Sequence, residues 1–322
     1  MNVAEPSILS TILTFLLNLL LSLLIAILGF FGISIGESPD ANSGTVMPPI
    51  EIPATPSTGE IAQASGDLVN AAWLATQLEY PDLRIVALVS PDEFAAGHIP
   101  GAVQIDWPVF AITDTSDASV SAWEANVSAT LGTLGITQDS RVVVYDNGSH
   151  YAPRLWWILK ALGHQNVSLL DGGLMAWQQS GQTVESGNSS ATPASASFQA
   201  VLDPSIVAAK ADVEAALNLP GTVLVDARTP QEYAAGHIPG AVNIPFTENY
   251  DADGTLLDID VLTALYTDLG VTPDASIIVY CSTGVRAASD AFALDYLGYP
   301  DVRLYLGSFD EWSADPSLPV EK

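Results

Sequence analysis

The longest uninterrupted apolar stretch of the chain lies near its N-terminus. Residues 8–35 carry no charged side chain and are mostly Leu, Ile and Phe. At a rise of about 1.5 Å per residue, a helix of this length exceeds the ~30 Å hydrocarbon core of a bilayer. We therefore expect residues 1–36 to form an N-terminal transmembrane helix, as a membrane anchor or signal-anchor. The alternative is a cleaved signal peptide, which the absence of a preceding Lys or Arg and of a clear cleavage site disfavours.

Farther along the chain, apolar residues gather in short runs separated by amphipathic stretches. The strand-like runs lie at residues 84–89, 141–146, 167–170, 222–228, 276–281 and 302–306. Short buried strands that alternate with helices indicate βαβ units, which build a mostly parallel sheet flanked by helices on both faces. The predicted fold class is therefore α/β.

One segment of this pattern occurs twice. FAAGHIPGAV at residues 94–103 recurs as YAAGHIPGAV at residues 233–242, and only the first residue differs. About 40 residues after each copy comes an apolar run that ends in a tyrosine and one further residue, RVVVYD in the first case and SIIVYC in the second. A period of about 140 residues is too long for a solenoid repeat and indicates two duplicated domains.

Two polar segments separate the apolar regions. Both are rich in Pro, Ser, Thr and Gly, a composition that cannot bury a core and is typical of tethers. The expected organisation is an anchor at 1–36, a flexible linker at 37–65, a first domain at 66–185, a second linker at 186–199 and a second domain at 200–322.

The charge balance limits the partners. The 322 residues include 37 Asp and Glu but only nine Lys and Arg, which gives a net charge of −28. A field of this sign argues against nucleic acid as a partner. The positive-inside rule has almost nothing to count, because the first basic residue is Arg84. The polar tether after the apolar segment favours domains on the extracytoplasmic side of the membrane.

The chain has a single cysteine, Cys281, so neither an intramolecular disulfide nor a Cys-based metal site can form. It follows a buried strand and precedes a Gly-containing turn, CSTGVR, which leads to a helix expected to start near Val285 or Arg286. Backbone N–H groups in such a turn and the helix dipole favour an anion and thus stabilise a thiolate. The competing interpretation is a buried Cys that simply ends a core strand.

The motifs resemble those of the rhodanese superfamily. The second domain carries DARTPQEYAAGHIPGAVNIP, CSTGVR and LGSFDEW where that family has its motifs, and the likeness spans nearly all of residues 67–318. VVVYDNGSHYAPRLWWILKALGH and LLDGGLMAW in the first domain look like the non-catalytic half of tandem thiosulfate and mercaptopyruvate sulfurtransferases. In that half Asp146 stands at the position of the reactive Cys, which implies a catalytically silent domain. Its loop lacks the CxxGxR arrangement, so we expect no comparable cradle for a thiolate there.

The resemblance implies a ping-pong sulfurtransferase without a metal or an organic cofactor. Cys281 would take the outer sulfur of thiosulfate as a persulfide and pass it to cyanide or a thiol. The six-residue loop, shorter than that of phosphatase relatives, would bind the donor. Its substrate-binding residues are Ser282, Thr283, Gly284, Val285 and Arg286.

Departures from the family pattern bear on the donor. Thr283 replaces a Lys that is frequent in thiosulfate enzymes. Glu232 stands near the place of an Arg found in mercaptopyruvate enzymes, and Ala87 stands where those enzymes have an Asp. We therefore expect thiosulfate rather than mercaptopyruvate, although another persulfide donor stays open. A persulfide carrier or sensor that delivers sulfur to a partner protein is the alternative function, and a phosphatase-like or anion-binding module on the same fold is a third that the loop length disfavours.

Other residues outside the loop are candidates for supporting roles. Asp226 and Arg228 are expected to pair and hold the site. His98 and its counterpart His237 more simply bond the backbone of their own turns than act as acids or bases. Arg154 either reaches toward the catalytic face or pairs with acids of the first domain. Core or interdomain packing is the simplest role for three tryptophans, Trp156, Trp157 and Trp177.

Overall fold

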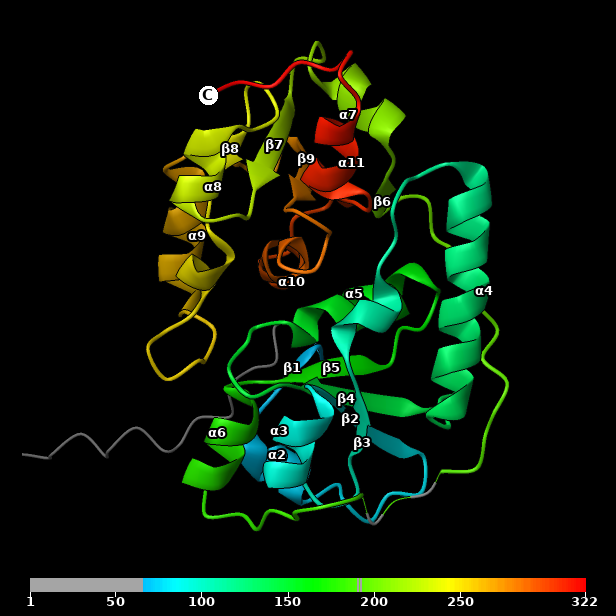
Figure 1. Cartoon of the computed structure of the whole chain (residues 1–322). Helices are drawn as coiled ribbons and strands as arrows, with labels where there is room; N and C mark the ends of the chain where they lie inside the picture. The colour runs from blue at the N-terminus through cyan, green and yellow to red at the C-terminus, as the bar shows by residue number, and fades with distance from the viewer. Residues whose placement is uncertain (1–65, 190, 192) are drawn as a thin grey trace, which may run out of the picture. The chain divides into compact units, whose positions relative to one another are not determined.

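The computed structural model describes residues 66–189, 191 and 193–322 (Figure 1). The first half of this region alternates strands and helices. Its elements are β1 (Leu68–Val69), α2 (Ala71–Ala75), β2 (Leu83–Leu88), α3 (Pro91–Ala96), β3 (Val103–Ile105), the 3-10 helix η1 (Trp107–Phe110), α4 (Asp117–Thr133), β4 (Arg141–Tyr145), α5 (Ala152–Ala161), β5 (Val167–Leu170) and α6 (Gly173–Gln179).

The second half repeats the same order. Its elements are β6 (Val207–Ala208), α7 (Lys210–Ala216), β7 (Thr222–Asp226), α8 (Pro230–Ala235), β8 (Val242–Asn243), the 3-10 helix η2 (Phe246–Asn249), α9 (Ile259–Thr267), β9 (Ser276–Tyr280), α10 (Ala287–Tyr296), β10 (Val302–Tyr305) and α11 (Ser308–Ala314).

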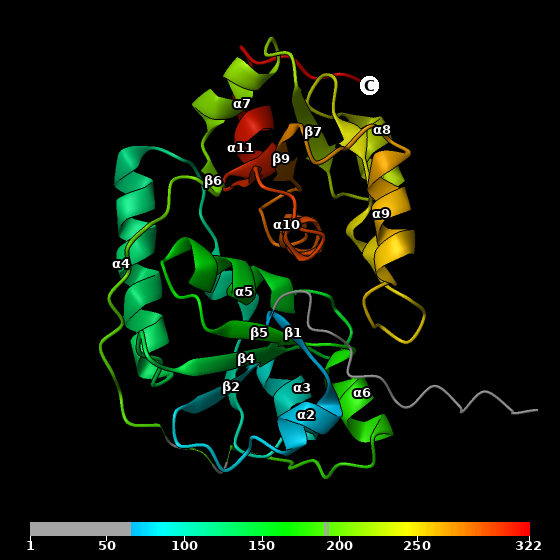
Figure 2. The same cartoon turned by 180° about the vertical axis from the view of Figure 1, so that it is seen from behind.

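Each half contains one five-stranded sheet (Figures 1 and 2). The strand orders are β1-β5-β4-β2-β3 and β6-β10-β9-β7-β8, so corresponding strands take corresponding places. Every strand pair in these two sheets is parallel. The predicted parallel α/β organisation is confirmed for both domains.

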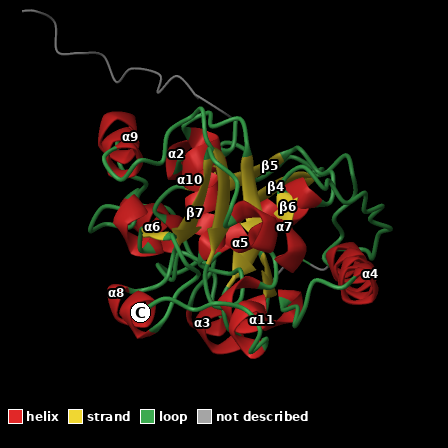
Figure 3. Ribbon diagram, turned by 90° about the horizontal axis from the view of Figure 1, so that it is seen from above, coloured by secondary structure: helices red, strands yellow, loops and turns green. Residues whose placement is uncertain are grey.

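Helices cover both faces of each sheet, as the continuous apolar strands predict (Figure 3). Along β2, Ile85 and Ala87 pack with α2, α3 and α6, whereas Val86 and Leu88 pack with α4 and α5. In the second sheet, α7 and α11 cover one face, and α9 and α10 cover the other. A single apolar cluster includes α5 and α10, which lie side by side between the two sheets (Figures 1 and 2).

The repeated GHIPGA turn is fastened to the strand that precedes each loop. The Tyr145 hydroxyl accepts the N–H of Ile99 at 3.0 Å, and the Tyr280 hydroxyl accepts the N–H of Ile238 at 3.1 Å. These bonds explain why each apolar run ends in a tyrosine: the buried phenol satisfies a backbone donor of the turn.

Within the predicted second linker, residues 186–199, described residues lie against the first domain. Phe198 is buried in the apolar cluster, and the N–H of Ala196 donates to the carbonyl of Gly132 on α4. A Cβ at Gly132 would lie 2.5 Å from the carbonyl oxygen of Ala196, so the approach requires glycine. Polar composition alone did not reveal this packing, because one buried aromatic and a few backbone bonds suffice for it.

The expected anchor at 1–36 and linker at 37–65 lie outside the described residues. Within residues 66–189, 191 and 193–322, no helix combines the length and the apolar character that a bilayer crossing requires.

Candidate active site

Cys281 directly follows β9, at the carboxyl end of a central strand of the second sheet. Its backbone is held on both sides: its N–H donates to Ser308 Oγ at 3.3 Å, and its carbonyl accepts the N–H of Phe309 at 3.0 Å. Both partners belong to α11. The side chain is only 1% exposed. Cys281 is therefore buried, and its backbone is held in place by two hydrogen bonds.

The turn after Cys281 presents a backbone donor to the sulfur. The N–H of Gly284 lies 3.1 Å from Sγ. Gly284 has φ +80°, and a Cβ there would lie 3.2 Å from the carbonyl oxygen of Leu306, so both conformation and space favour glycine. α10 begins at Ala287, just after the expected start near Val285 or Arg286, with Arg286 as its N-cap. A donor aimed at Sγ near a helix N-terminus favours an anionic sulfur.

Arg286 forms a two-point ion pair with Glu232, which sequence reasoning did not foresee. Its Nη1 and Nη2 each lie 2.8 Å from a Glu232 carboxylate oxygen, and Nη2 also donates to Ser282 Oγ at 2.8 Å. The arginine lowers the pKa of Glu232 to about 2, and the hydrogen bond to Glu232 raises the pKa of Arg286. The remaining loop side chains differ in exposure: Val285 is buried, and Thr283 is partly exposed.

The sequence around Glu232 predicts a role for this residue, but only as a helix cap. Thr229 and Glu232 form a capping box at the start of α8, in which the Thr229 hydroxyl donates to Glu232 Oε2 at 2.7 Å. The T-x-x-E spacing predicts that cap. The second partner, Arg286, is 54 residues away along the chain, a distance that no local pattern bridges.

Asp226 and Arg228 form the expected pair. Arg228 Nη2 lies 2.6 Å from Asp226 Oδ2 and 2.8 Å from the carbonyl oxygen of Gly236, and both charged side chains are buried. The Arg228 guanidinium also lies 3.9 Å from the centroid of the Phe309 ring. Because Phe309 donates its N–H to the Cys281 carbonyl, the pair is connected to the cysteine through α11.

The two repeated histidines bond their own turns. His98 Nδ1 lies 2.9 Å from the carbonyl of Phe94, and His237 Nδ1 lies 3.0 Å from that of Tyr233. On its other side, His98 approaches Glu185 of the first domain at 3.6 Å. The structure thus places His98 in a turn of the first domain and shows no contact between it and the Cys281 loop among the described residues.

Arg154, by contrast, reaches the loop. It lies on α5 of the first domain, is fully buried, and donates from Nη1 to the carbonyl of Gly284 at 3.2 Å. No carboxylate of the described residues lies within ion-pair distance of it, so pairing with first-domain acids was the wrong alternative. The expected packing roles of the tryptophans are confirmed. Trp156 contacts Phe292 of α10 edge to face, and Trp177 is buried in the first domain.

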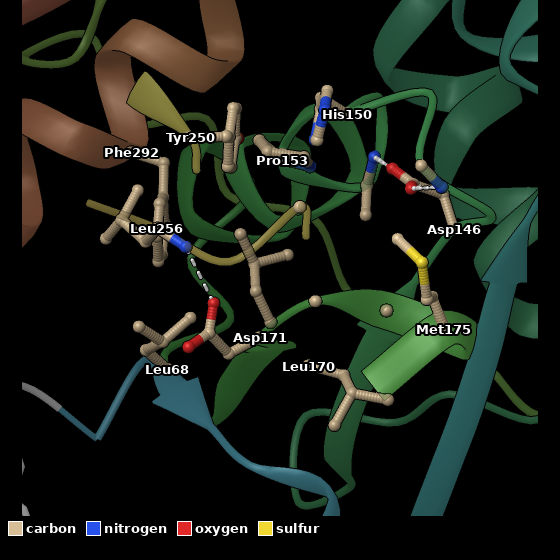
Figure 4. Close-up of a pocket in the computed structure, with 16 residues that line it drawn as sticks. Leu68, Asp146, His150, Pro153, Leu170, Asp171, Met175, Tyr250, Leu256 and Phe292 are labelled. Atoms are coloured by element: carbon tan, nitrogen blue, oxygen red, sulfur yellow. Dashed lines mark hydrogen bonds between the residues drawn. The ribbon is translucent and has the colours of Figure 1, made fainter. Parts of the chain in front are cut away.

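The corresponding loop of the first domain holds a carboxylate. Asp146 follows β4, and its side chain accepts the N–H groups of Gly148 and Ala152 at 2.8 Å (Figure 4). It also accepts the N–H of Tyr151 at 2.7 Å. This loop therefore presents backbone N–H donors to an anion, and the Asp146 carboxylate accepts three of them. The expectation that a thiolate at this position would have no cradle comparable to that of Cys281 stays a prediction.

A small cavity of about 40 Å³ adjoins this first-domain loop, and side chains of both domains line it (Figure 4). His150 stacks on Tyr250 with ring centroids 4.0 Å apart, and Asp171 accepts the N–H of Leu256 at 2.9 Å. Such a volume holds a few water molecules. The second domain therefore covers the Asp146 loop closely.

Comparison with known proteins agrees with this architecture. The family described as "Rhodanese-like domain" matches residues 70–180 and 209–315. A 3-mercaptopyruvate sulfurtransferase of Escherichia coli is 34% identical over 275 residues, covering 79% of this chain and 97% of the relative. A thiosulfate sulfurtransferase of Pseudomonas aeruginosa is 33% identical over 263 residues, covering 79% and 96%.

A solved structure extends the likeness to three dimensions. The crystal structure of a 3-mercaptopyruvate sulfotransferase from Escherichia coli superposes with a TM-score of 0.67 at 35% identity and covers 76% of this chain and 99% of that one. Two copies of the same parallel α/β domain, matched family motifs in both, and full-length relatives at this identity lead to one assignment. The chain belongs to the rhodanese family, with two rhodanese-like domains in tandem.

Proposed function

We propose that this protein is a sulfurtransferase that carries a sulfane sulfur on Cys281, with thiosulfate as the donor. The observation that supports this most directly is the Gly284 N–H at 3.1 Å from Sγ, in a turn that leads into α10. Relatives that act on thiosulfate and on 3-mercaptopyruvate are about equally similar to this chain. They support sulfur transfer and leave mercaptopyruvate as the competing donor.

The reaction consists of two displacements at sulfur. The Cys281 thiolate attacks the outer sulfur of thiosulfate, a new S–S bond forms, and the S–S bond of thiosulfate breaks as sulfite leaves with the electron pair. Cyanide or a thiolate then attacks the outer sulfur of the persulfide and restores the Cys281 thiolate. The loop stabilises the anionic sulfur in both steps, which is where preorganised N–H donors are most effective.

Steady-state formation of thiocyanate from thiosulfate and cyanide tests the proposal. A protein lacking residues 1–60 should turn over many times, Cys281→Ser should be inactive, and mercaptopyruvate should be the poorer donor. Sulfur labelling that stops at one equivalent would identify a persulfide carrier instead. Equal turnover by wild type and Cys281→Ser would refute the role of Cys281.

We also propose that residues 1–36 anchor the protein in a membrane, with the rhodanese domains on the extracytoplasmic side. The support is the uncharged apolar stretch at 8–35. Full-length protein should be recovered with membranes, and deletion of residues 1–36 should release it. Unprocessed full-length protein in the soluble fraction would contradict the anchor.

A further inference from the structure

Arg154 is a buried cation that pairs with no carboxylate of the described residues. Its guanidinium donates to two backbone carbonyls, those of Gly284 at 3.2 Å and Phe110 at 3.4 Å, and Nε has no hydrogen-bond acceptor. The Trp157 ring gives weak further compensation, with its centroid 5.3 Å from Arg154 Cζ. Burying a guanidinium with so few hydrogen-bond acceptors is unfavourable unless a negative charge lies nearby.

Gly284 connects this cation to the sulfur. Its carbonyl accepts from Arg154, while its N–H donates to Cys281 Sγ. The contact is close, since a Cβ at Gly284 would lie 3.2 Å from Arg154 Nη1. Burial lowers the pKa of Arg154 to about 10, and the charge of the Cys281 thiolate opposes that shift. The group that can supply the missing negative charge is therefore the thiolate or persulfide of Cys281.

We propose that Arg154 is a positioning residue through which the first domain stabilises the anionic sulfur of the second: it fixes the Gly284 peptide and supplies a counter-charge from behind the loop. The inference rests on the proposed role of Cys281. It gives the first domain a part in the chemistry although its own loop holds Asp146. It also supplies a positive charge to a loop in which Thr283 stands in place of the lysine of related enzymes.

The test measures the thiolate itself, without any sulfur donor. Because Cys281 is the only cysteine, the ultraviolet absorbance of the thiolate as a function of pH reports on this group alone. The absorbance of ionised tyrosines is removed by subtracting the titration of Cys281→Ser. Arg154→Met removes the charge and refills the volume without a buried polar group. Arg84→Met is the matched control, because Arg84 also bonds backbone carbonyls of the first domain, those of Pro81, Leu83 and Gly135.

We expect the midpoint of the thiolate titration to rise by about 1–2 pH units in Arg154→Met, in line with the loss of one nearby opposite charge. Below both midpoints, alkylation by uncharged iodoacetamide should then slow by about 10- to 100-fold, because the thiolate fraction falls tenfold per unit. Arg84→Met should change neither quantity. An unchanged midpoint in a folded Arg154→Met protein, with only the melting temperature lowered, would overturn the proposal.

Two safeguards keep the result decisive. If Arg154→Met does not fold, Arg154→Gln replaces it, because a neutral amide also removes the charge and can still donate to the Gly284 carbonyl. A rise of the midpoint in the folded variant supports the proposal, and no rise refutes it. A wild type without sulfur transfer but with an Arg154-dependent titration would refute the proposed function alone.

Discussion

The two domains share the same strand–loop–helix backbone but place different side chains, a carboxylate and a thiol, at the start of the loop. In each domain a central strand ends in a tyrosine, and the next residue is Asp146 in the first domain and Cys281 in the second. Five residues then precede the first residue of the following helix. The Asp146 carboxylate accepts three backbone N–H groups. Cys281 Sγ accepts one, from Gly284. In the first loop the Asp146 carboxylate thus occupies the backbone N–H donors. In the second loop the cysteine sulfur lies beside the Gly284 N–H, and the loop also contacts Arg154 and Arg286.

The position that precedes each helix shows the same contrast. Arg286 stands there in the second domain and Tyr151 in the first. Arg286 pairs with Glu232 of the α8 capping box. The equivalent Glu93 of α3 forms the capping box with Ser90, and its pKa is lowered by Ser90 alone. A few side chains therefore place positive charge around the sulfur on a backbone that both domains share. Substitutions at these side chains test the comparison.

The largest effect should come from moving the cysteine between the two loops. The double variant Asp146→Cys, Cys281→Ser should show no thiocyanate formation above that of Cys281→Ser. A sulfur at position 146 would keep backbone donors but lack an arginine in the place of Arg286, where Tyr151 stands. Activity restored above that of Cys281→Ser would show that the loop backbone alone suffices.

An intermediate effect is expected at Arg286. Its contact with a sulfonate should contribute roughly 1.5–3 kcal/mol, so Arg286→Ala should lower the second-order rate with thiosulfate by about 10- to 100-fold. A less charged persulfide donor should lose less, and high salt should slow thiosulfate turnover in the wild type. Arg303→Ala is the control, since Arg303 pairs with Asp212 away from the loop. Equal losses for both donors would mean that Arg286 braces the loop through Glu232 and Ser282.

The smallest effect concerns acid stability. Because Arg286 depresses the pKa of Glu232 to about 2 from 4.5, the ionised carboxylate stabilises the folded state above about pH 4.5, and this contribution is lost as the pH falls toward 2. Glu232→Gln should therefore melt about 1–3 °C below the wild type at pH 7, a small difference because the pair is partly exposed. The difference should shrink through this window.

Glu93→Gln is the matched control for that measurement. It removes the same charge from the same position of the first domain's capping box, where no arginine is paired with it. The difference in melting temperature between Glu93→Gln and the wild type should change less between pH 4.5 and pH 2 than the difference between Glu232→Gln and the wild type. An equal change of the two differences would assign the effect to the helix caps and not to the pairing of Glu232 with Arg286.

Much of the fold followed from local patterns. The repeated GHIPGA turn, the strand that ends at Cys281, the Asp226–Arg228 pair and the backbone bonds of His98 and His237 are all short-range features, and each follows from residue types within a few positions. What could not be predicted depends on residues far apart in the chain. The Glu232–Arg286 pair, the destination of Arg154 and the burial of Phe198 depend on how helices and domains pack, which periodicity does not encode.

The most direct measurement of the central claim is the intact mass of the protein after incubation with thiosulfate and removal of excess donor. The wild type should gain the mass of one sulfur atom, cyanide should remove it, and Asp146→Ala should gain the same mass, because the first loop carries no sulfur. Cys281→Ser should gain nothing. A gain of sulfur by Cys281→Ser, or an unmodified wild type under conditions in which it forms thiocyanate, would contradict the persulfide at Cys281.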